Sequence, residues 1–321
     1  MLKKMFVFML SVLSFCCGPQ VAAAVPQALT GIFAHGLGGS AAQIEQYAEI
    51  FGPLIGRNGP EWDRELHGAK AGPQQSCLAQ QGDIDVIVGQ MAERVGETSM
   101  LVGVSKGGAT MFNTIGYCAE HRPELLVGLR AAIFDCPFKN PESVAKQIVH
   151  TAAVQVRRRG GWFSGSSASS METSADSSMA PSCFRGATSV AYKNYDRSGA
   201  TPEKALEQWA LPIVNREMVV VFIHSRADEL ISVNDSRYLY RELLRIGYRN
   251  VYLIEVEHGE HAAELWGADS GFIYSCLRAI YERHGFALSG VLRDAMPLED
   301  LAMAQPTIEQ VAERMAAGGR K

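Results

Sequence analysis

The sequence predicts an α/β fold built on a mostly parallel sheet with helices on both faces. Short apolar runs typical of strands alternate with longer segments of helical spacing along much of the 321-residue chain. The run from Met218 to Ile223 is apolar and rich in β-branched residues, which is typical of a strand covered on both faces. Ser105, Asp228 and His261 each follow a predicted strand. Because the carboxyl ends of parallel strands meet at one edge of a sheet, we expect these side chains to lie close together.

The composition is that of an ordinary soluble globular protein. Apolar residues make up 47% of the chain and charged residues 20%, which is ample material for a core. A formal net charge of -4 gives no electrostatic footprint for nucleic acid, so no nucleic-acid partner is expected. The cysteines do not form a C-x-x-C pair, and we expect neither a metal nor another cofactor.

Residues 1–24 read as a signal peptide. Lys3 and Lys4 precede an apolar run, Met5 to Phe15, that is too short to span a bilayer, and small residues end at Ala24. This pattern predicts cleavage after Ala24 and export to the periplasm or out of the cell. The alternative is a lipoprotein signal at Cys16, but the bulky phenylalanine before that cysteine fits it poorly.

The first predicted unit of the fold is a strand, a glycine-rich loop and a helix. Residues 28–33 are strand-like, and large apolar side chains recur at helical spacing through 41–55. His35-Gly-Leu-Gly-Gly-Ser40 joins them. The loop lacks the G-x-x-x-x-G-K-[ST] spacing of a phosphate-binding loop. The other interpretation is a loop that offers backbone N–H groups to an oxyanion.

A polar stretch and a helix lead to the segment around which the chain is organised. Residues 56–81 are polar with a possible edge strand at Glu65 to His67, and 83–95 has helical spacing. Gly103-x-Ser105-x-Gly107 then lies between an apolar strand, from Met100, and a helix at 110–120. Glycines two residues either side of a serine make room for a strained turn that exposes the hydroxyl. The alternative is an ordinary glycine-rich turn.

The alternation continues with a strand and is then interrupted. Residues 125–134 read as a buried strand closed by Asp135. Residues 139–217 read as a cap-like insertion, with helices expected at its two ends, 141–156 and 202–209. Between them, Ser164 to Ser182 is rich in serine, glycine and alanine, which predicts a disordered loop because little apolar surface is available for burial.

The remaining predicted elements complete the core. They are the strand at 218–223, a helix at 232–246, a strand at 251–256 and a helix at 270–283. The domain organisation that follows is a core of 25–138 and 218–290, the insertion, and a polar C-terminal tail at 291–321.

At this point the sequence resembles the α/β-hydrolase superfamily. The resemblance rests on H-G-L-G-G-S, G-V-S-K-G, H-S-R-A-D-E-L-I-S and H-G-E-H, and on the chain order Ser…Asp…His. It implies Ser105 as nucleophile, His261 as base and Asp228 as the acid that orients the histidine. It also implies the N–H groups of Leu37 and Lys106 as the oxyanion hole.

Three alternatives for these roles stay open from the sequence. Asp135 also ends a strand and is the rival acid, while Asp228 has a second possible role in capping the helix that starts near Ser232. His258 is the rival base. A metal site from His258, Glu260 and His261 is disfavoured because the spacing is not H-E-x-x-H and no further ligand cluster stands out.

The sequence therefore predicts an exported serine hydrolase that cleaves a carboxylic ester or related acyl bond through an acyl-enzyme. A peptidase or an acyltransferase would use the same triad, and an inactive secreted binding or effector protein could keep the same fold. A small-molecule or lipid-like ester is the expected substrate. Trp162 and Phe163, beside three arginines, suggest peripheral contact of the insertion with a lipid surface, and the alternative there is a solvated basic loop.

Overall fold

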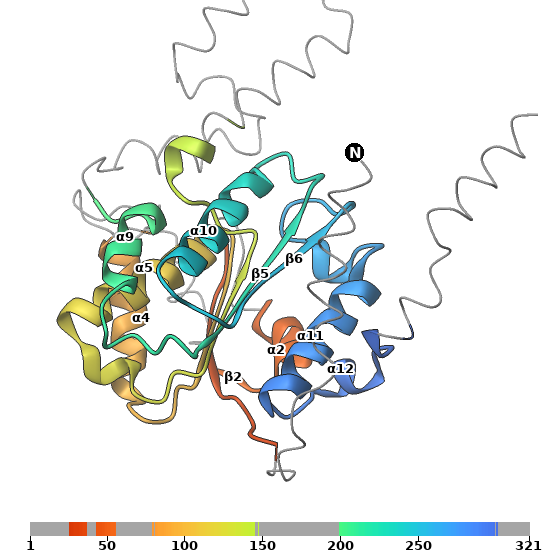
Figure 1. Cartoon of the computed structure of the whole chain (residues 1–321), viewed down its shortest axis with the longest axis horizontal. Coiled ribbons are helices and arrows are strands. Elements are labelled where there is room, and N and C mark those ends of the chain that lie inside the picture. Colours follow the sequence, from red (N-terminus) through yellow and green to blue (C-terminus); the bar gives the residue numbers. More distant parts are fainter. Residues whose placement is uncertain are drawn as a thin grey trace, which may run out of the picture.

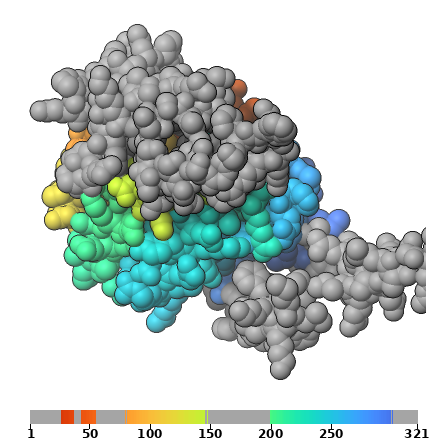
Figure 2. All heavy atoms as spheres, turned by 90° about the horizontal axis from the view of Figure 1, so that it is seen from above, coloured from red at the N-terminus to blue at the C-terminus, as the bar shows by residue number. Residues whose placement is uncertain are grey.

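A computed structural model describes residues 26–36, 43–55, 79, 81–144, 147, 199–298 and 300. The predicted signal peptide and the predicted disordered loop lie outside these residues, as do Trp162, Phe163 and the possible edge strand at 65–67. The tail beyond residue 300 also lies outside them. The segments 81–144 and 199–298 form one continuous body in the space-filling view of Figure 2.

The fold is built on a six-stranded sheet in which every neighbouring pair is parallel. Its spatial order is β2-β1-β3-β4-β5-β6. The strands are β1 (Gly31–Ala34), β2 (Leu54–Ile55), β3 (Met100–Val104), β4 (Ala131–Asp135), β5 (Val219–Ser225) and β6 (Val251–Val256). The chain passes from β2 back across β1 to β3, so the strand order reverses there. Parallel sheets of this kind carry their ligand sites at the carboxyl ends of the strands near such a reversal.

Helices cover both faces of the sheet, as predicted (Figure 1). One face carries α4 (Gln81–Glu93), α5 (Lys106–His121), α9 (Pro202–Trp209) and α10 (Val233–Arg245). The other carries α2 (Gln43–Phe51), α11 (Ser270–His284) and α12 (Gly290–Asp294). Among the described residues no helix is both long and apolar enough to cross a membrane.

The buried strands explain why their sequences show no alternation of polar and apolar residues. Successive side chains point to opposite faces, and both faces are covered. In β4, Phe134 packs with α5 and α9, while its neighbour Ile133 packs in the cluster of the opposite face. All five residues of β3 and all seven of β5 are buried.

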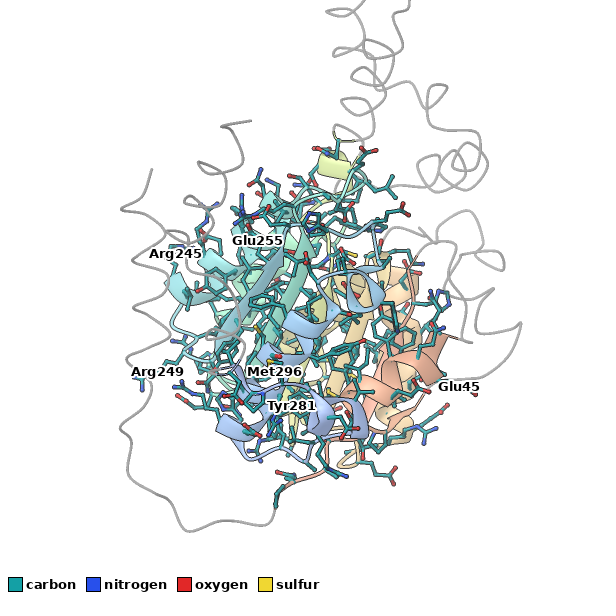
Figure 3. All side chains as sticks on the ribbon, turned by 90° about the vertical axis from the view of Figure 1, so that its right-hand side faces the viewer. Glu45, Arg245, Arg249, Glu255, Tyr281 and Met296 are labelled. Carbon is teal, nitrogen blue, oxygen red and sulfur yellow. The ribbon has the colours of Figure 1, made fainter. Side chains whose placement is uncertain are left out.

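Helix α9 belongs to the packed body although it lies in the predicted insertion. Trp209 is fully buried, stacks on Phe112 with ring centroids 4.4 Å apart, and donates from Nε1 to the Phe112 carbonyl at 3.0 Å. Thr201 caps the helix by accepting from the Lys204 amide, and Pro202 occupies its first turn. In the opposite layer lies Tyr281 of α11, which is labelled in Figure 3. Its hydroxyl donates to the Phe51 carbonyl at 3.2 Å and ties α11 to α2.

Three of the differences from the sequence-based expectations change which element forms. Residues 54–55 form the edge strand β2 instead of ending a helix, because Gly52, with φ +99°, and Pro53 stop α2. The expected strand at 125–134 starts only at Ala131, after a 3-10 helix η1 (Pro123–Leu126). Part of the expected polar tail folds as α12, where Leu292 is fully buried.

Candidate active site

The predicted turn at Ser105 lies between β3 and α5 and has a strained backbone. Ser105 has φ 53° and ψ -117°, in the left-handed half of conformational space that favours glycine. A Cβ on Gly107 would lie 2.1 Å from the Ala34 carbonyl oxygen, and one on Gly103 would lie 2.5 Å from the Gly107 carbonyl oxygen. Only glycine fits at these two positions, so the G-x-S-x-G spacing is a steric requirement of the turn.

The structure brings Ser105, His261 and Asp228 into one hydrogen-bonded line. His261 Nε2 lies 2.8 Å from Ser105 Oγ, and His261 Nδ1 lies 2.7 Å from Asp228 Oδ2. Since an ionised carboxylate only accepts, Nδ1 carries the proton and Nε2 is free to accept from the serine hydroxyl. The three residues come from three different strand exits, 156 positions apart at the extreme.

Asp228 is held in its ionised form by its surroundings. Its Oδ1 accepts from the Leu230 and Ile231 amides at 2.8 and 2.9 Å, which leaves Oδ2 for His261. Burial favours a raised pKa, but hydrogen bonds from His224 and His261 outweigh it and hold the pKa of Asp228 below its usual range. The alternative role of Asp228, capping of α10, is filled by Ser232, whose hydroxyl accepts from the Asn234 amide.

His224 is a site residue that the sequence reasoning missed. It ends the apolar run of β5, is fully buried, and its Nε2 lies 3.0 Å from the Ile231 carbonyl and 3.3 Å from Asp228 Oδ2. Its Nδ1 lies 2.8 Å from the Ser236 hydroxyl. These partners assign the proton to Nε2, so His224 supports the same carboxylate oxygen that His261 contacts. A histidine that ends an otherwise apolar buried strand was the available signal.

The alternative acid and base lie elsewhere. His258 is exposed, with its Nδ1 3.3 Å from Asp269 Oδ2, and its side chain is not part of the Ser105 line. Asp135 is fully buried and accepts from the Tyr47 hydroxyl at 2.7 Å. The geometry therefore favours Asp228 and His261 over Asp135 and His258.

The N-terminus of α5 places the backbone amide of Lys106, one of the two expected oxyanion donors, next to Ser105. Lys106 is the first residue of the helix, so its amide lies at the positive end of the helix dipole beside Ser105. Leu37 lies outside the described residues, but the preceding Gly36 passes close to the serine: a Cβ there would lie 3.1 Å from the Ser105 Cβ. The loop that leaves β1 therefore borders Ser105.

The Lys106 side chain has a separate role that the sequence did not indicate. It turns into the protein and pairs with Asp83, Nζ to Oδ1 3.1 Å, with both side chains only 2% exposed. The Ala79 amide donates to the other Asp83 oxygen at 2.8 Å. This buried ion pair fixes the start of α5 against α4, and with it the turn that carries Ser105.

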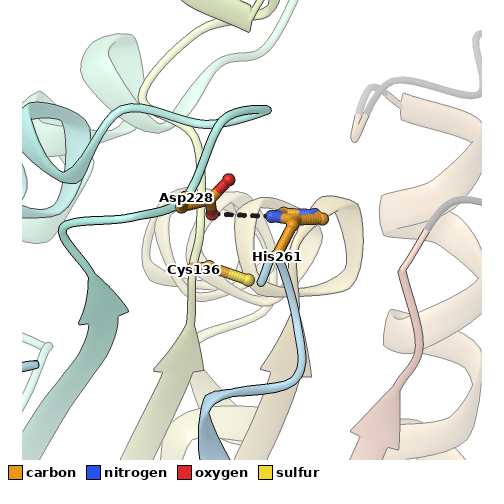
Figure 4. A group of neighbouring side chains, drawn as sticks. All are labelled: Cys136, Asp228 and His261. Carbon is orange, nitrogen blue, oxygen red and sulfur yellow. Dashed lines mark hydrogen bonds and ion pairs between the residues drawn. The ribbon is translucent and has the colours of Figure 1, made fainter. Parts of the chain in front are cut away.

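A thiol lies directly beneath the histidine. Figure 4 shows Cys136, at the end of β4, below Asp228 and His261, and one ligand atom of each lies within 4.8 Å of the others. The second group of potential ligand side chains in the described part of the chain is Asp135, Cys136 and Glu264. Both groups share Cys136, and every member is buried except His261, which is partly buried. Cys118 and Cys136 are both buried, as their apolar surroundings in the sequence indicate.

Sheet order, the serine turn and the chain order of the three site residues together define the α/β-hydrolase fold. The predicted fold class is confirmed. No family model matches the sequence, and no curated protein matches it at the significance threshold.

A search of solved structures finds matches to hydrolases. One is an esterase of Pyrococcus furiosus, at 12% identity and TM-score 0.43 over 82% of this chain and 85% of the other. Another is a monoacylglycerol lipase of Paleococcus ferrophilus, at 15% identity and TM-score 0.42 over 81% and 96%. An acylaminoacyl peptidase of Pyrococcus horikoshii matches at 13% identity and TM-score 0.44 over 86% of this chain and 40% of the other.

Proposed function

We propose that this chain is a serine hydrolase that cleaves a carboxylic ester or a related acyl bond through an acyl-enzyme. The observation that carries the proposal is the continuous line from the Ser105 hydroxyl through His261 to Asp228, at 2.8 and 2.7 Å. A serine hydroxyl is a weak nucleophile until a base takes its proton, and this line provides that base.

In the proposed acylation step, Ser105 Oγ attacks the substrate carbonyl carbon as His261 Nε2 accepts the hydroxyl proton. Asp228 stays ionised and stabilises the imidazolium that forms. The carbonyl oxygen becomes an oxyanion and accepts hydrogen bonds from the Lys106 amide and, as the second proposed donor, the Leu37 amide. His261 then protonates the departing alcohol, which leaves the acyl group on Ser105.

Deacylation repeats the same chemistry with water as the nucleophile. His261 Nε2 takes a proton from water, the hydroxide attacks the acyl carbon, and the carboxylic acid leaves as Ser105 Oγ recovers the proton. Stopped-flow hydrolysis of a p-nitrophenyl ester tests this sequence. A burst of p-nitrophenol close to one equivalent per chain supports an acyl-enzyme whose breakdown is slow. Mass spectrometry after an acid quench provides independent support if it detects the acyl group on Ser105.

A peptidase or an acyltransferase would use the same triad as an ester hydrolase. Parallel assays with a p-nitrophenyl ester, a peptide p-nitroanilide and an ester with an added alcohol acceptor separate the three. An inactive binding protein predicts no turnover in any of them and no covalent labelling of Ser105.

We further propose that the protein is exported. The support is the sequence pattern of residues 1–24, a charged start, a short apolar run and small residues before the cleavage site. The purified exported protein should begin at Val25, which intact-mass measurement checks. A mature protein that retains residue 1, or a lipid-modified N-terminus at Cys16, would contradict it.

A further inference from the structure

Two further acidic side chains lie buried next to each other beneath the proposed active site. Asp135 ends β4, and Glu264 starts the short helix η3 (Glu264–Trp266), three residues after His261. Both side chains are fully buried, and with Cys136 they bring one ligand atom each within 4.8 Å of one another. Two carboxylates this close in a dry site repel strongly when both are ionised.

Each carboxyl group has one oxygen with a partner and one without. Asp135 Oδ2 accepts from the Tyr47 hydroxyl at 2.7 Å, and Glu264 Oε1 lies 3.4 Å from the Ser225 amide. Asp135 Oδ1 and Glu264 Oε2 have no hydrogen-bond partner among the described residues, and no ion pair compensates either group there.

Several titratable groups from neighbouring elements face the pair, and these surroundings favour a retained proton. They are Tyr47 of α2, Cys136 after β4, His224 and Asp228 of β5 and its exit loop, and His261 of the neighbouring loop. Burial, together with the charges of Asp135 and Asp228, raises the pKa of Glu264 to about 9. Burial raises the pKa of Asp135 to about 6, against the Tyr47 hydrogen bond, which lowers it.

Glu264 is also the point at which the His261 loop meets the sheet. The loop folds over its side chain: Gly259 has φ +134°, and a Cβ there would lie 3.2 Å from Glu264 Cγ. Through the Ser225 amide the same side chain reaches the end of β5. In the sequence, His261 lies between Gly259 and Glu264, whose close approach closes the loop.

We propose that Glu264 is a positioning residue for His261, which it holds in place only while Asp135 and Glu264 together keep one proton. Loss of that proton leaves both Asp135 and Glu264 ionised beside the ionised Asp228. The Glu264 side chain then moves toward solvent, and the loop that carries His261 moves with it. This proposal rests on the proposed function, because its main readout is turnover by Ser105.

The test compares pH profiles of Glu264→Gln and Glu260→Gln with that of the unmodified protein. Glu260 is an exposed glutamate of the same loop, so it is a matched control for the loss of one carboxylate. The measurement is kcat/KM for p-nitrophenyl butyrate from pH 7 to 10, corrected for spontaneous hydrolysis and normalised to each protein's own value at pH 7.5. The unmodified protein and Glu260→Gln should fall about tenfold per pH unit above the last ionisation of the pair. Glu264→Gln should keep its profile flat, within about twofold.

If kcat/KM of Glu264→Gln falls at alkaline pH as steeply as that of the unmodified protein, the proposal is overturned. Failure of the proposed function looks different, because then the unmodified protein has no turnover at any pH. Infrared difference spectra of the unmodified protein provide a second readout, which requires neither turnover nor a variant that folds. A carboxylic-acid carbonyl band should be present in the unmodified protein at pH 7.5 and disappear above pH 9. Absence of that band at pH 7.5 would also overturn the proposal.

Thermal stability offers a further readout. A carboxyl group whose folded pKa is raised contributes stability that is complete below its unfolded pKa and is lost as the pH rises through the folded value. Between pH 5 and pH 9.5 the Tm of the unmodified protein should therefore fall by several degrees more than that of Glu264→Gln. Equal falls would count against a retained proton.

Discussion

Replacing Asp228 with asparagine keeps the size of the side chain and changes the proton on His261. The Leu230 and Ile231 amides donate to Oδ1 at 2.8 and 2.9 Å, so an asparagine places its carbonyl oxygen there. Its NH₂ group then faces His261 Nδ1, where the carboxylate oxygen lies at 2.7 Å. A donor at this position forces the proton of the neutral imidazole onto Nε2. In that tautomer His261 cannot accept the Ser105 proton.

The size of the loss follows from that tautomer. In serine proteases the equivalent change lowers kcat by about 10⁴-fold with the geometry intact. At about 1.4 kcal/mol for each factor of ten, this is a loss of about 5 kcal/mol of transition-state stabilisation. We expect a loss of similar size for Asp228→Asn in this protein.

The assay is kcat/KM for a p-nitrophenyl ester at pH 7.5, with circular dichroism to verify folding. Asp269→Asn is the matched control, since Asp269 Oδ2 also lies beside a histidine ring, 3.3 Å from His258 Nδ1, but away from the Ser105 line. The control should stay within about twofold of the unmodified protein. A loss of less than tenfold in folded Asp228→Asn, or an equal loss in Asp269→Asn, would refute the assignment.

Four further outcomes follow from the same contacts. His261→Ala should abolish nearly all acylation in an active-site labelling assay, while His258→Ala should cost little; the reverse ranking would move the base to His258. Gly107→Ala should lower activity and the Tm together, because the added methyl meets a β1 carbonyl at 2.1 Å; an active variant with unchanged Tm would contradict this. Trp209→Ala should cost about 3–5 kcal/mol of unfolding free energy in urea titrations, and a loss below about 1 would mean that α9 is not part of the core. Asp228, whose pKa is held low, contributes stability that is present above its unfolded pKa and lost as the pH falls below it, so acid should reduce the stability of the unmodified protein more than that of Asp228→Asn.

Elements with a strong local signal were predicted closely. The strand at 251–256 has the same bounds in the structure, and the predicted helix at 270–283 is α11 with one more residue. Periodicity and capping are local properties of the chain, so they can be read without the fold. Edge strand β2 has only two residues, Leu54 and Ile55, and exists because β1 lies beside it. A pairing that short leaves no periodic pattern in the sequence.

The site residues also divide into those that the sequence predicted and those that only the fold brings together. Ser105, Asp228 and His261 were predicted from the strand exits and chain order, and the structure brings them together. His224 and Glu264 were not predicted, because their importance comes from burial and from neighbours distant in sequence. His224 lies next to Asp228 only because the β5 exit turns back on itself. Glu264, which follows β6, meets Asp135 only because β4 and β6 end at the same edge of the sheet.

Labelling with a fluorophosphonate probe tests the central claim, an activated Ser105, most directly. The probe reacts covalently with a serine whose proton a nearby base removes, and peptide mapping then identifies the modified residue. We expect one label per chain on the peptide containing Ser105, none in Ser105→Ala, and strongly reduced labelling in His261→Ala. Labelling of a different serine, or none at all in the folded unmodified protein, would contradict the claim.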